Sequence, residues 1–188
     1  MPILHAYAIA VLWLGWLAYW AVAAGNVKAT ASEESWQSRL AYSAPLWLAA
    51  FLLLDRHLGP LSQRFLPADI WIPTAGVLIT AAGFAVTIWA RVQLGTNWSA
   101  QVTVKHSHEL IRTGPYGLVR HPIYTGLTLA FIGTAVAIGE WRALAAAVIA
   151  IASFCYKLSI EERVMLETFG DEYRDYRRAV RALIPFVI

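Results

Sequence analysis

Residues 101–124 hold an unusual concentration of side chains that can bind charged groups or transfer protons. The densest part is Arg120-His121-Pro122-Ile123-Tyr124, which places a cation, an imidazole and a phenol within five positions, directly before an apolar segment. The other polar residues of this stretch include Gln101, Lys105, His106, His108, Glu109, Arg112 and Tyr116. Side chains of these types supply both donors and acceptors, so the stretch suits a charged ligand bound where water meets hydrocarbon.

The histidines of this stretch raise the question of a metal site. His106 and His108 have poor spacing for one helix face, and no cysteine or further carboxylate stands at ligand spacing from His121. We therefore expect no metal. A solvated basic loop at a lipid surface is the plainer interpretation, but it explains the basic residues and not Tyr116 or Tyr124.

A second candidate group begins at Glu161 and Glu162, only a few residues after the last long apolar segment. Carboxylates so close to a membrane are costly unless they are exposed or paired, and they often mark functional sites. Glu162, Leu166 and Tyr173 share one helix face, because they are separated by four and seven residues. Such a face is more often a packing surface than a binding site.

The composition indicates a membrane protein of one domain, residues 1–188. Of the 188 residues, 59% are hydrophobic and 14% are charged, whereas soluble domains carry roughly 25% charged residues. The mean hydropathy is +0.53. A net charge of +3 does not indicate a nucleic-acid partner. The single cysteine, Cys155, excludes an intramolecular disulfide, and its apolar neighbours predict a buried thiol.

Five apolar segments predict an all-α integral membrane protein with about five transmembrane helices: residues 3–24, 40–54, 70–90, 122–138 and 143–156. The first lacks the basic flank of a signal peptide, so we expect it to be retained. The short connection at residues 139–142 predicts that the last two segments form a helical hairpin. Residues 1–95 then hold three helices, and residues 96–188 form the half that carries the chemistry.

The distribution of basic residues predicts the orientation of these helices. With five spans, the loop after the first, the loop after the third and the C-terminal tail lie on one side. That side holds Lys28, Arg39, Arg91, Lys105, Arg112, Arg120, Lys157, Arg163, Arg174, Arg177, Arg178 and Arg181, whereas the other holds Arg56, Arg64 and Arg142. The N-terminus is therefore expected outside and the tail in the cytoplasm. A single cytoplasmic site would then combine the loop before the fourth helix with the C-terminal helical tail.

Two motifs carry a resemblance to a known family. RTGPYGLVRHPIYTG (residues 112–126), followed by EERVMLETFGDEYRDYRRAVRALIP (residues 161–185), resembles the isoprenylcysteine carboxyl methyltransferase family, with the phospholipid methyltransferases close to it. The resemblance covers residues 97–185. Membrane sterol reductases carry a similar RHPxYxG segment ahead of an NADPH site. The Glu161-Glu162 pair and the Phe169-Gly170 step resemble the methyltransferases instead.

The resemblance implies an S-adenosylmethionine-dependent methyltransferase. By position, the residues matching the family's cofactor contacts are Gln101, His108, Leu110, Tyr116, His121, Pro122, Tyr124 and Glu161. Catalytic roles would fall to Arg120, Tyr124, Lys157 and Glu162. Lys157 stands where the family places an arginine near the acceptor carboxylate. A lysine lacks the bidentate fork of arginine, so this departure leaves the identity of the acceptor open.

The chemistry of such a reaction fits these residue types. The cofactor is a zwitterion with a sulfonium, so it needs a cation, either His121 or Arg120, and an anion, Glu161. A carboxylate acceptor is already a nucleophile, whereas an amine or thiol would need a base that the sequence does not identify. We expect methyl transfer to a lipophilic acceptor that enters from the bilayer, in contact with membrane lipids, and foremost to the carboxylate of an isoprenylcysteine-like compound. The alternatives are a phospholipid or other lipophilic small molecule as acceptor, an NADPH-dependent reductase, and a non-catalytic scaffold or transporter subunit.

Overall fold

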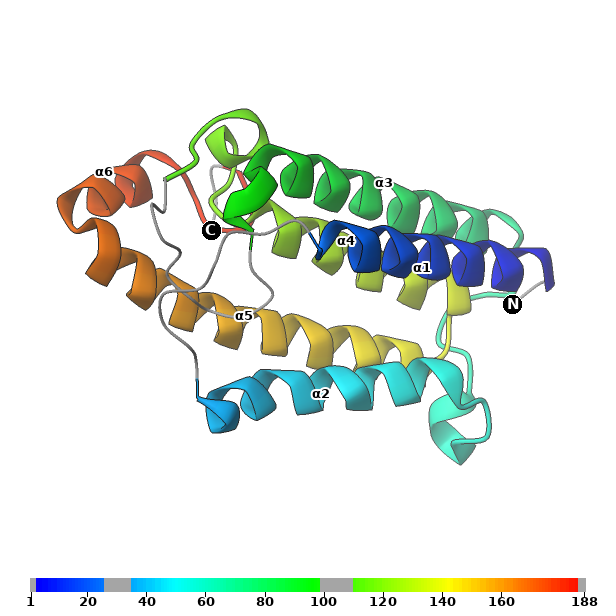
Figure 1. The fold of residues 1–188 in the computed structure, drawn as a ribbon. Coiled ribbons are helices and arrows are strands. Elements are labelled where there is room, and N and C mark those ends of the chain that lie inside the picture. Colours follow the sequence, from blue (N-terminus) through cyan, green and yellow to red (C-terminus); the bar gives the residue numbers. More distant parts are fainter. Residues whose placement is uncertain (1–2, 26–34, 99–109, 186–188) are drawn as a thin grey trace.

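The computed structural model describes residues 3–25, 35–98 and 110–185, and within them the fold is all-helical (Figure 1). The α-helices are α1 (Ile3–Ala23), α2 (Trp36–Leu54), α3 (Trp71–Leu94), α4 (Pro122–Ile138), α5 (Trp141–Phe169) and α6 (Asp171–Ala179). Three short 3₁₀ segments, η1 (Gly59–Ser62), η2 (Gly95–Asn97) and η3 (Gly114–Gly117), lie between them.

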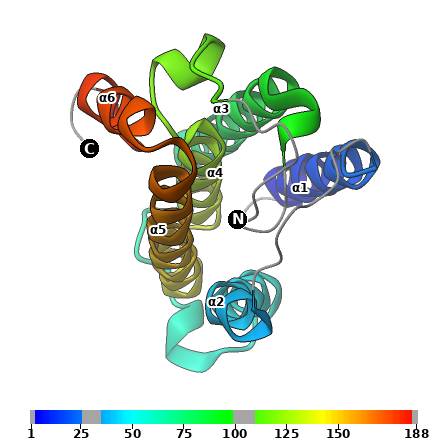
Figure 2. The same ribbon diagram turned by 60° about the vertical axis from the view of Figure 1, so that its left-hand side comes forward.

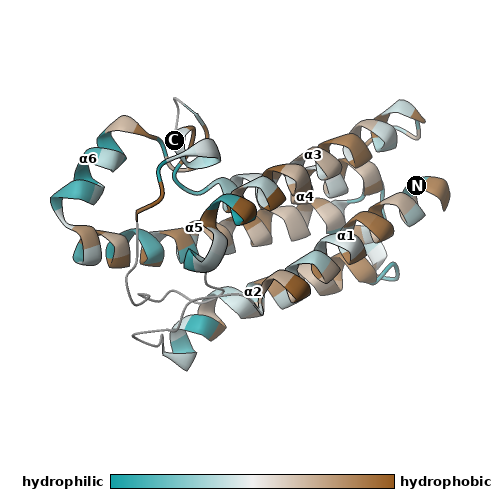
Figure 3. Cartoon of the chain, turned by 45° about the horizontal axis from the view of Figure 1, so that its top comes forward, coloured by the Kyte–Doolittle hydropathy of each residue, from teal (hydrophilic) through white to brown (hydrophobic). Residues whose placement is uncertain are grey.

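Three of the described helical segments are long and apolar enough to cross a membrane: Ile3–Ala23, Trp71–Asn97 and Trp141–Phe169. α4 is apolar but shorter. The polar residues gather on α6 and the adjoining end of α5, whereas the bundle itself is mainly apolar (Figure 3). Apolar side chains such as Val11 and Leu14 of α1 are 67% and 65% exposed. Exposed apolar surface of this extent belongs in lipid, so the chain is an integral membrane protein.

The helices pack in a consistent order. α4 lies between α3 and α5, α1 packs against α3 and α4, and α2 packs along α5 (Figure 2). Side-chain hydrogen bonds fix the position of α1: His5 Nε2 lies 2.9 Å from Thr74 Oγ1, and Trp16 Nε1 donates to Thr87 Oγ1 at 2.8 Å. The partners follow the same order along both helices, His5 before Trp16 on α1 and Thr74 before Thr87 on α3. The two helices therefore run in the same direction.

Glycines allow α3 and α4 to approach unusually closely. A Cβ atom added to Gly83 would lie 2.5 Å from the carbonyl oxygen of Gly126, and one added to Gly133 would lie 2.5 Å from the amide of Thr80. Small residues recur at helical spacing on both sides of this contact. Small residues at such a contact let two helices pack closely in lipid.

Arginines bind the free carbonyl groups at three helix ends. Arg91 donates to the carbonyl of Ala23 at the end of α1 (2.5 Å). Arg142 donates to the carbonyls of Leu52 and Leu53 at the end of α2 (3.0 and 2.7 Å). In the same way, Arg64 donates to Ile138 at the end of α4 (3.2 Å). The final carbonyls of a helix have no partner within it and carry partial negative charge, so each arginine stabilises one terminus.

Two expectations need correction. The last apolar segment was expected to end at Tyr156, but α5 continues without a break to Phe169, because the amphipathic residues after Lys157 keep helical periodicity. Cys155 was expected to be buried, and its side chain is exposed instead. It lies on an outward face of α5, where an apolar environment would be lipid rather than protein.

Candidate functional site

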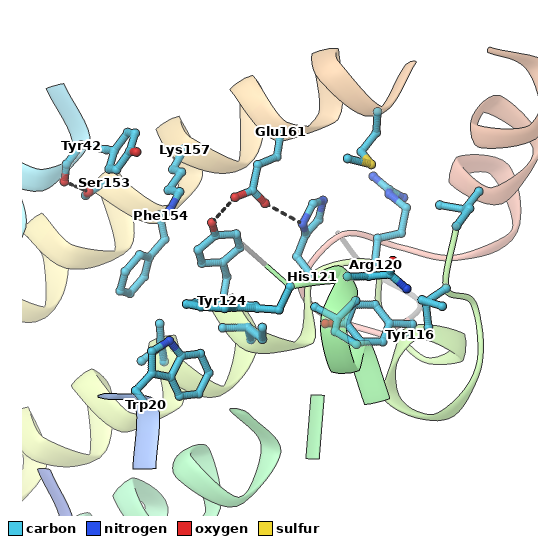
Figure 4. A pocket seen from close by; sticks show the side chains of 18 of the residues that line it. Trp20, Tyr42, Tyr116, Arg120, His121, Tyr124, Ser153, Phe154, Lys157 and Glu161 are labelled. Atoms are coloured by element: carbon cyan, nitrogen blue, oxygen red, sulfur yellow. Dashed lines mark hydrogen bonds and ion pairs between the residues drawn. The ribbon is translucent and has the colours of Figure 1, made fainter. Parts of the chain in front are cut away.

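A cavity of about 350 Å³ lies at the end of the bundle where α4 begins (Figure 4). It is bounded by α1, α2, the end of α3, η2, η3, α4, α5 and α6, so nearly every described element contributes to it. Its aromatic lining includes Trp16, Trp20, Tyr42, Trp98, Phe154 and Tyr176. The volume falls within the range of small-molecule sites, and the lining is mainly apolar with a few polar groups, as such sites usually are.

The start of α4 positions the most polar part of this lining. Pro122 occupies the first helical position, where its missing N–H costs nothing and its fixed φ suits the helix. The Pro122 side chain is fully buried, so its described role is to begin the helix. His121 is then placed at the helix end and Tyr124 one turn later, and both side chains line the cavity.

Glu162 is the centre of a buried ionic cluster beside the cavity. Its Oε1 atom accepts hydrogen bonds from Arg120 Nε (2.8 Å) and from the Tyr173 hydroxyl (3.0 Å), and it lies 2.9 Å from His121 Nε2. Its Oε2 atom pairs with Arg177 Nε at 2.9 Å. Glu162 is only 7% exposed. A buried carboxylate is tolerated only when charges and donors compensate it, and here four side chains do so.

Glu161 faces the cavity on the other side of His121. Its Oε1 atom accepts a hydrogen bond from the Tyr124 hydroxyl at 2.5 Å, and its Oε2 atom lies 3.7 Å from His121 Nδ1. Figure 4 shows the imidazole and the phenol both directed toward this carboxylate. His121 therefore lies between two glutamates, Glu161 at one ring nitrogen and Glu162 at the other.

Three tyrosines outside the apolar segments have raised pKa values and remain protonated at neutral pH. Burial raises the pKa of Tyr116, and the nearby charge of Glu161 raises it further. Burial and the neighbouring Glu162 likewise raise the pKa of Tyr173. Burial raises the pKa of Tyr176 to about 12, and its hydroxyl donates to the carbonyl of Tyr116 at 2.6 Å. None of these three phenols is suited to act as a base at neutral pH.

The C-terminal strap, residues 180–183, holds the polar side of the site in place. The amide of Arg120 donates to the carbonyl of Arg181 at 2.8 Å, and the amide of His121 donates to that of Ala182 at 3.0 Å. The motif at the start of α4 is thus hydrogen-bonded through its backbone to the tail and through its side chains to α5. Two segments about 60 residues apart form one unit.

Comparison with known proteins identifies the family. The model of the phospholipid methyltransferase family matches residues 71–172, more than half of the chain. The chain belongs to this family. A protein-S-isoprenylcysteine O-methyltransferase of Arabidopsis thaliana is 28% identical over 120 residues, which cover 62% of this chain and 61% of that protein. The corresponding protein of Schizosaccharomyces pombe is 33% identical over 101 residues, 52% of this chain and 43% of that protein.

Two further similarities are informative. Methanethiol S-methyltransferase 1 of Bradyrhizobium diazoefficiens is 44% identical over 71 residues, 38% of this chain and 24% of that protein. The structure of the eukaryotic intramembrane Ras methyltransferase ICMT superimposes with a TM-score of 0.56 at 26% identity, covering 84% of this chain and 55% of that one. The chain spans about three fifths of the length of the Arabidopsis relative.

A lysine lines the cavity on the side of α2. Lys157, one turn before Glu161 on α5, lies with its Nζ atom 4.6 Å from the centre of the Tyr42 ring. The Ser153 hydroxyl donates to the carbonyl of Tyr42 at 2.6 Å, which ties α5 to α2 beside this lysine. An ammonium over an aromatic face is stabilised by the ring quadrupole. The cavity therefore has a carboxylate, Glu161, and a cation on successive turns of one helix.

The structure brings most of the predicted site residues together. The cavity lining includes Leu110, Tyr116, Arg120, His121, Tyr124, Lys157 and Glu161. Glu162 lies behind His121 and Pro122 is buried at the helix start, while Gln101 and His108 lie outside the described residues. Sequence reasoning missed the aromatic contribution of α1 and α2. The aromatic residues in the second half of the first apolar segment were the available signal, but aromatic residues at such positions also form the interfacial belt of membrane helices.

Proposed function

We propose that this protein is a membrane-embedded S-adenosylmethionine-dependent methyltransferase that methylates a lipophilic acceptor. The observation that carries the proposal is the placement of Glu161, Tyr124 and His121 on the wall of an otherwise aromatic cavity. These residues come from the two motifs that resemble the methyltransferases. Membership of the phospholipid methyltransferase family supports a methyl donor over the hydride donor of a sterol-type reductase.

The residues of the cavity fit the cofactor chemically. Glu161 is an anion suited to the ammonium group of the amino-acid end, and Tyr116 and Tyr124 stand near it in the lining. The aromatic walls suit a sulfonium, which is attracted to ring faces as other cations are. Leu110 would contact the adenine, whereas the cofactor contacts of Gln101 and His108 stay predictions from the resemblance. Arg120 is held by Glu162, so its role here is to maintain the site.

The bound cofactor would supply an electrophilic methyl group. During transfer the bond between methyl carbon and sulfur breaks while a bond to the acceptor forms, and the cleaved pair of electrons stays on sulfur. Positioning provides a large part of the rate in such an in-line displacement. Lys157 would hold an anionic acceptor from the α2 side of the cavity. A carboxylate needs no base, and the carboxylate of an isoprenylcysteine-like compound is therefore our first candidate acceptor.

A thiol is the second candidate acceptor, and a phospholipid is a further one. Two observations make the thiol a candidate beside the carboxylate. The relative with 44% identity over the matched segment is named for methanethiol, and Lys157 offers an anionic group a single point charge rather than a fork. A thiolate requires only a point charge. The Lys157 ammonium would stabilise the thiolate relative to the thiol.

The proposed topology has five transmembrane helices, α1 to α5, with α4 and α5 as an antiparallel hairpin. Successive spans must cross the membrane in opposite directions, so the first and third must run in the same direction. The parallel course of α1 and α3 agrees with this requirement. The N-terminus would lie outside, and the cavity, the strap and α6 would face the cytoplasm, where S-adenosylmethionine is available. Residues 1–95 would mainly shape the route for the lipophilic acceptor, and residues 96–188 would hold the cofactor.

The test is methyl transfer by the purified protein in nanodiscs. Radiolabelled S-adenosylmethionine would be supplied with a prenylcysteine analogue, a phosphatidylethanolamine or an alkanethiol, and the extracted product counted. We expect label in at least one of these acceptors, and little label with Glu161→Gln. Glu167→Gln, the same change at an exposed position of α5, is the control. Binding of NADPH without binding of S-adenosylmethionine would refute the proposal.

A further inference from the structure

Glu162 does not line the cavity, yet it contacts a residue that does. We infer that Glu162 is a positioning residue: it holds the proton of neutral His121 on Nε2, so that Nδ1 and Glu161 together accept from the ammonium group of the cofactor. This inference rests on the proposed function and sharpens it. His121 then acts as a hydrogen-bond acceptor, and not as the cation for the cofactor carboxylate that the sequence had suggested.

The contacts of Glu162 require an ionised carboxylate. Arg120 and Arg177 are always charged donors, and the Tyr173 hydroxyl donates to the same oxygen as Arg120. A proton on Glu162 could be directed only at His121 Nε2, and the two guanidinium groups beside the carboxyl group favour its ionised form, which only accepts. The fourth contact, His121 Nε2 at 2.9 Å, must therefore also carry a proton.

This assignment determines what His121 presents to the cavity. A neutral imidazole has one donor nitrogen and one acceptor nitrogen, so a proton on Nε2 leaves a lone pair on Nδ1. Nδ1 lies 3.7 Å from Glu161 Oε2, on the side that lines the cavity. Two acceptors this far apart do not bond to each other. They match two of the three N–H donors of an ammonium group, which would bridge them.

The charges around His121 support the neutral form when ligand is bound. Glu162 already faces two guanidinium groups, so an imidazolium would be a third cation at one carboxylate. At Glu161 the ammonium of the ligand would supply the positive charge. The titratable or charged groups around the ring are Glu161 and Glu162 from α5, Arg120 and Tyr124 at the start of α4, Tyr116 from η3, and Tyr173 and Arg177 from α6.

A dependence of ligand affinity on pH follows from this arrangement. Protonation of Nδ1 turns the acceptor into a donor and places a positive charge where the ammonium binds, so affinity must fall as the pH decreases. The negative charge of Glu162 favours that protonation. Removal of this charge should therefore allow binding to persist to a lower pH. A residue that only held α6 in place would weaken binding equally at every pH.

The experiment measures the affinity of the full-length protein in nanodiscs for S-adenosylhomocysteine, across the pH range in which histidine titrates. In Glu162→Gln the amide oxygen can still accept from Nε2, but the charge is gone. We expect the pH of half-maximal affinity to move down in Glu162→Gln, and Glu167→Gln to leave it unchanged. An unchanged midpoint in Glu162→Gln, even with weaker binding throughout, would overturn the inference.

A second measurement does not require Glu162→Gln to fold or the protein to bind ligand. In wild-type protein with ¹⁵N-labelled histidine, NMR can report which ring nitrogen of His121 carries the proton, with His121→Asn used to assign the signal. We expect the proton on Nε2 at neutral pH, and a proton on Nδ1 alone would overturn the inference. Wild-type protein that binds no S-adenosyl compound at any pH would instead refute the proposed function, while the tautomer would still decide the role of Glu162.

Discussion

Glu162 Oε1 lies 2.9 Å from His121 Nε2, although 41 residues separate the two in the chain. This contact joins the motif at the start of α4 to the carboxylate pair on α5. The next residue, Glu161, lies 3.7 Å from the other ring nitrogen and faces the cavity. Adjacent glutamates thus have different surroundings: Glu162 lies in the buried ionic cluster, and Glu161 lines the cavity.

Glu161→Gln should weaken binding of the cofactor. A hydrogen bond to a charged partner contributes about 1.5–3 kcal/mol, so we expect the dissociation constant for S-adenosylmethionine to rise roughly ten- to hundredfold. Tyr124→Phe removes only a donor to Glu161 and should have a smaller effect. Isothermal titration calorimetry on both variants measures this, and equal affinity in Glu161→Gln and wild type would contradict the assignment of Glu161 to the ammonium.

Arg120→Ala should destabilise the fold. It leaves Glu162 buried with one guanidinium fewer, and breaking a buried ion pair by removing one partner costs about 3–5 kcal/mol. Thermal unfolding in detergent, followed by the exposure of buried tryptophans, should show a clearly lower midpoint. Arg178→Ala is the matched control because Arg178 is exposed and its ion pair is with the exposed Asp175. A midpoint equal to that of the control would show that Arg120 is dispensable.

Gly83→Ala should separate α3 from α4. The added Cβ would lie 2.5 Å from the carbonyl of Gly126, so the helices must move apart, and overpacking of this kind costs about 1–3 kcal/mol. Gly15→Ala on α1 is the comparison, since a Cβ there meets nothing within 4 Å. We expect a lower unfolding midpoint in detergent for Gly83→Ala alone. Similar midpoints for the two variants would mean that the contact between α3 and α4 adapts easily to the added methyl group.

Lys157→Ala should affect the acceptor rather than the cofactor. Lys157 lies over Tyr42, on the α2 side of the cavity, one turn from Glu161. With an anionic acceptor we expect KM for the acceptor to rise about tenfold, as the loss of roughly 1.4 kcal/mol implies. The affinity for S-adenosylhomocysteine should change little.

Lys157→Arg distinguishes the candidate acceptors further. A guanidinium can bind a carboxylate through two parallel hydrogen bonds, which an ammonium cannot do. We therefore expect Lys157→Arg to lower KM for a carboxylate acceptor and to leave KM for a thiol unchanged or raised. Parallel assays with a prenylcysteine analogue and an alkanethiol measure the difference. If neither Lys157 variant changes KM for any acceptor, this residue does not meet the substrate.

The sequence by itself determined the class of protein and the two halves of the site. Apolar segments about as long as a bilayer is thick predicted the helices, because the backbone must satisfy its hydrogen bonds internally in lipid. The two motifs resembled methyltransferases, and the family match bears that out.

Only the tertiary structure decided how the halves meet. Glu161 and Glu162 are adjacent in sequence, and the resemblance implied a cofactor contact for the first and a catalytic role for the second. Neighbouring positions on a helix point about 100° apart, so one faces the cavity and the other the ion cluster. The aromatic walls from α1 and α2 were unpredictable for a related reason. An apolar aromatic residue satisfies lipid and protein surroundings alike, and only the packing of the helices shows which residues line the cavity.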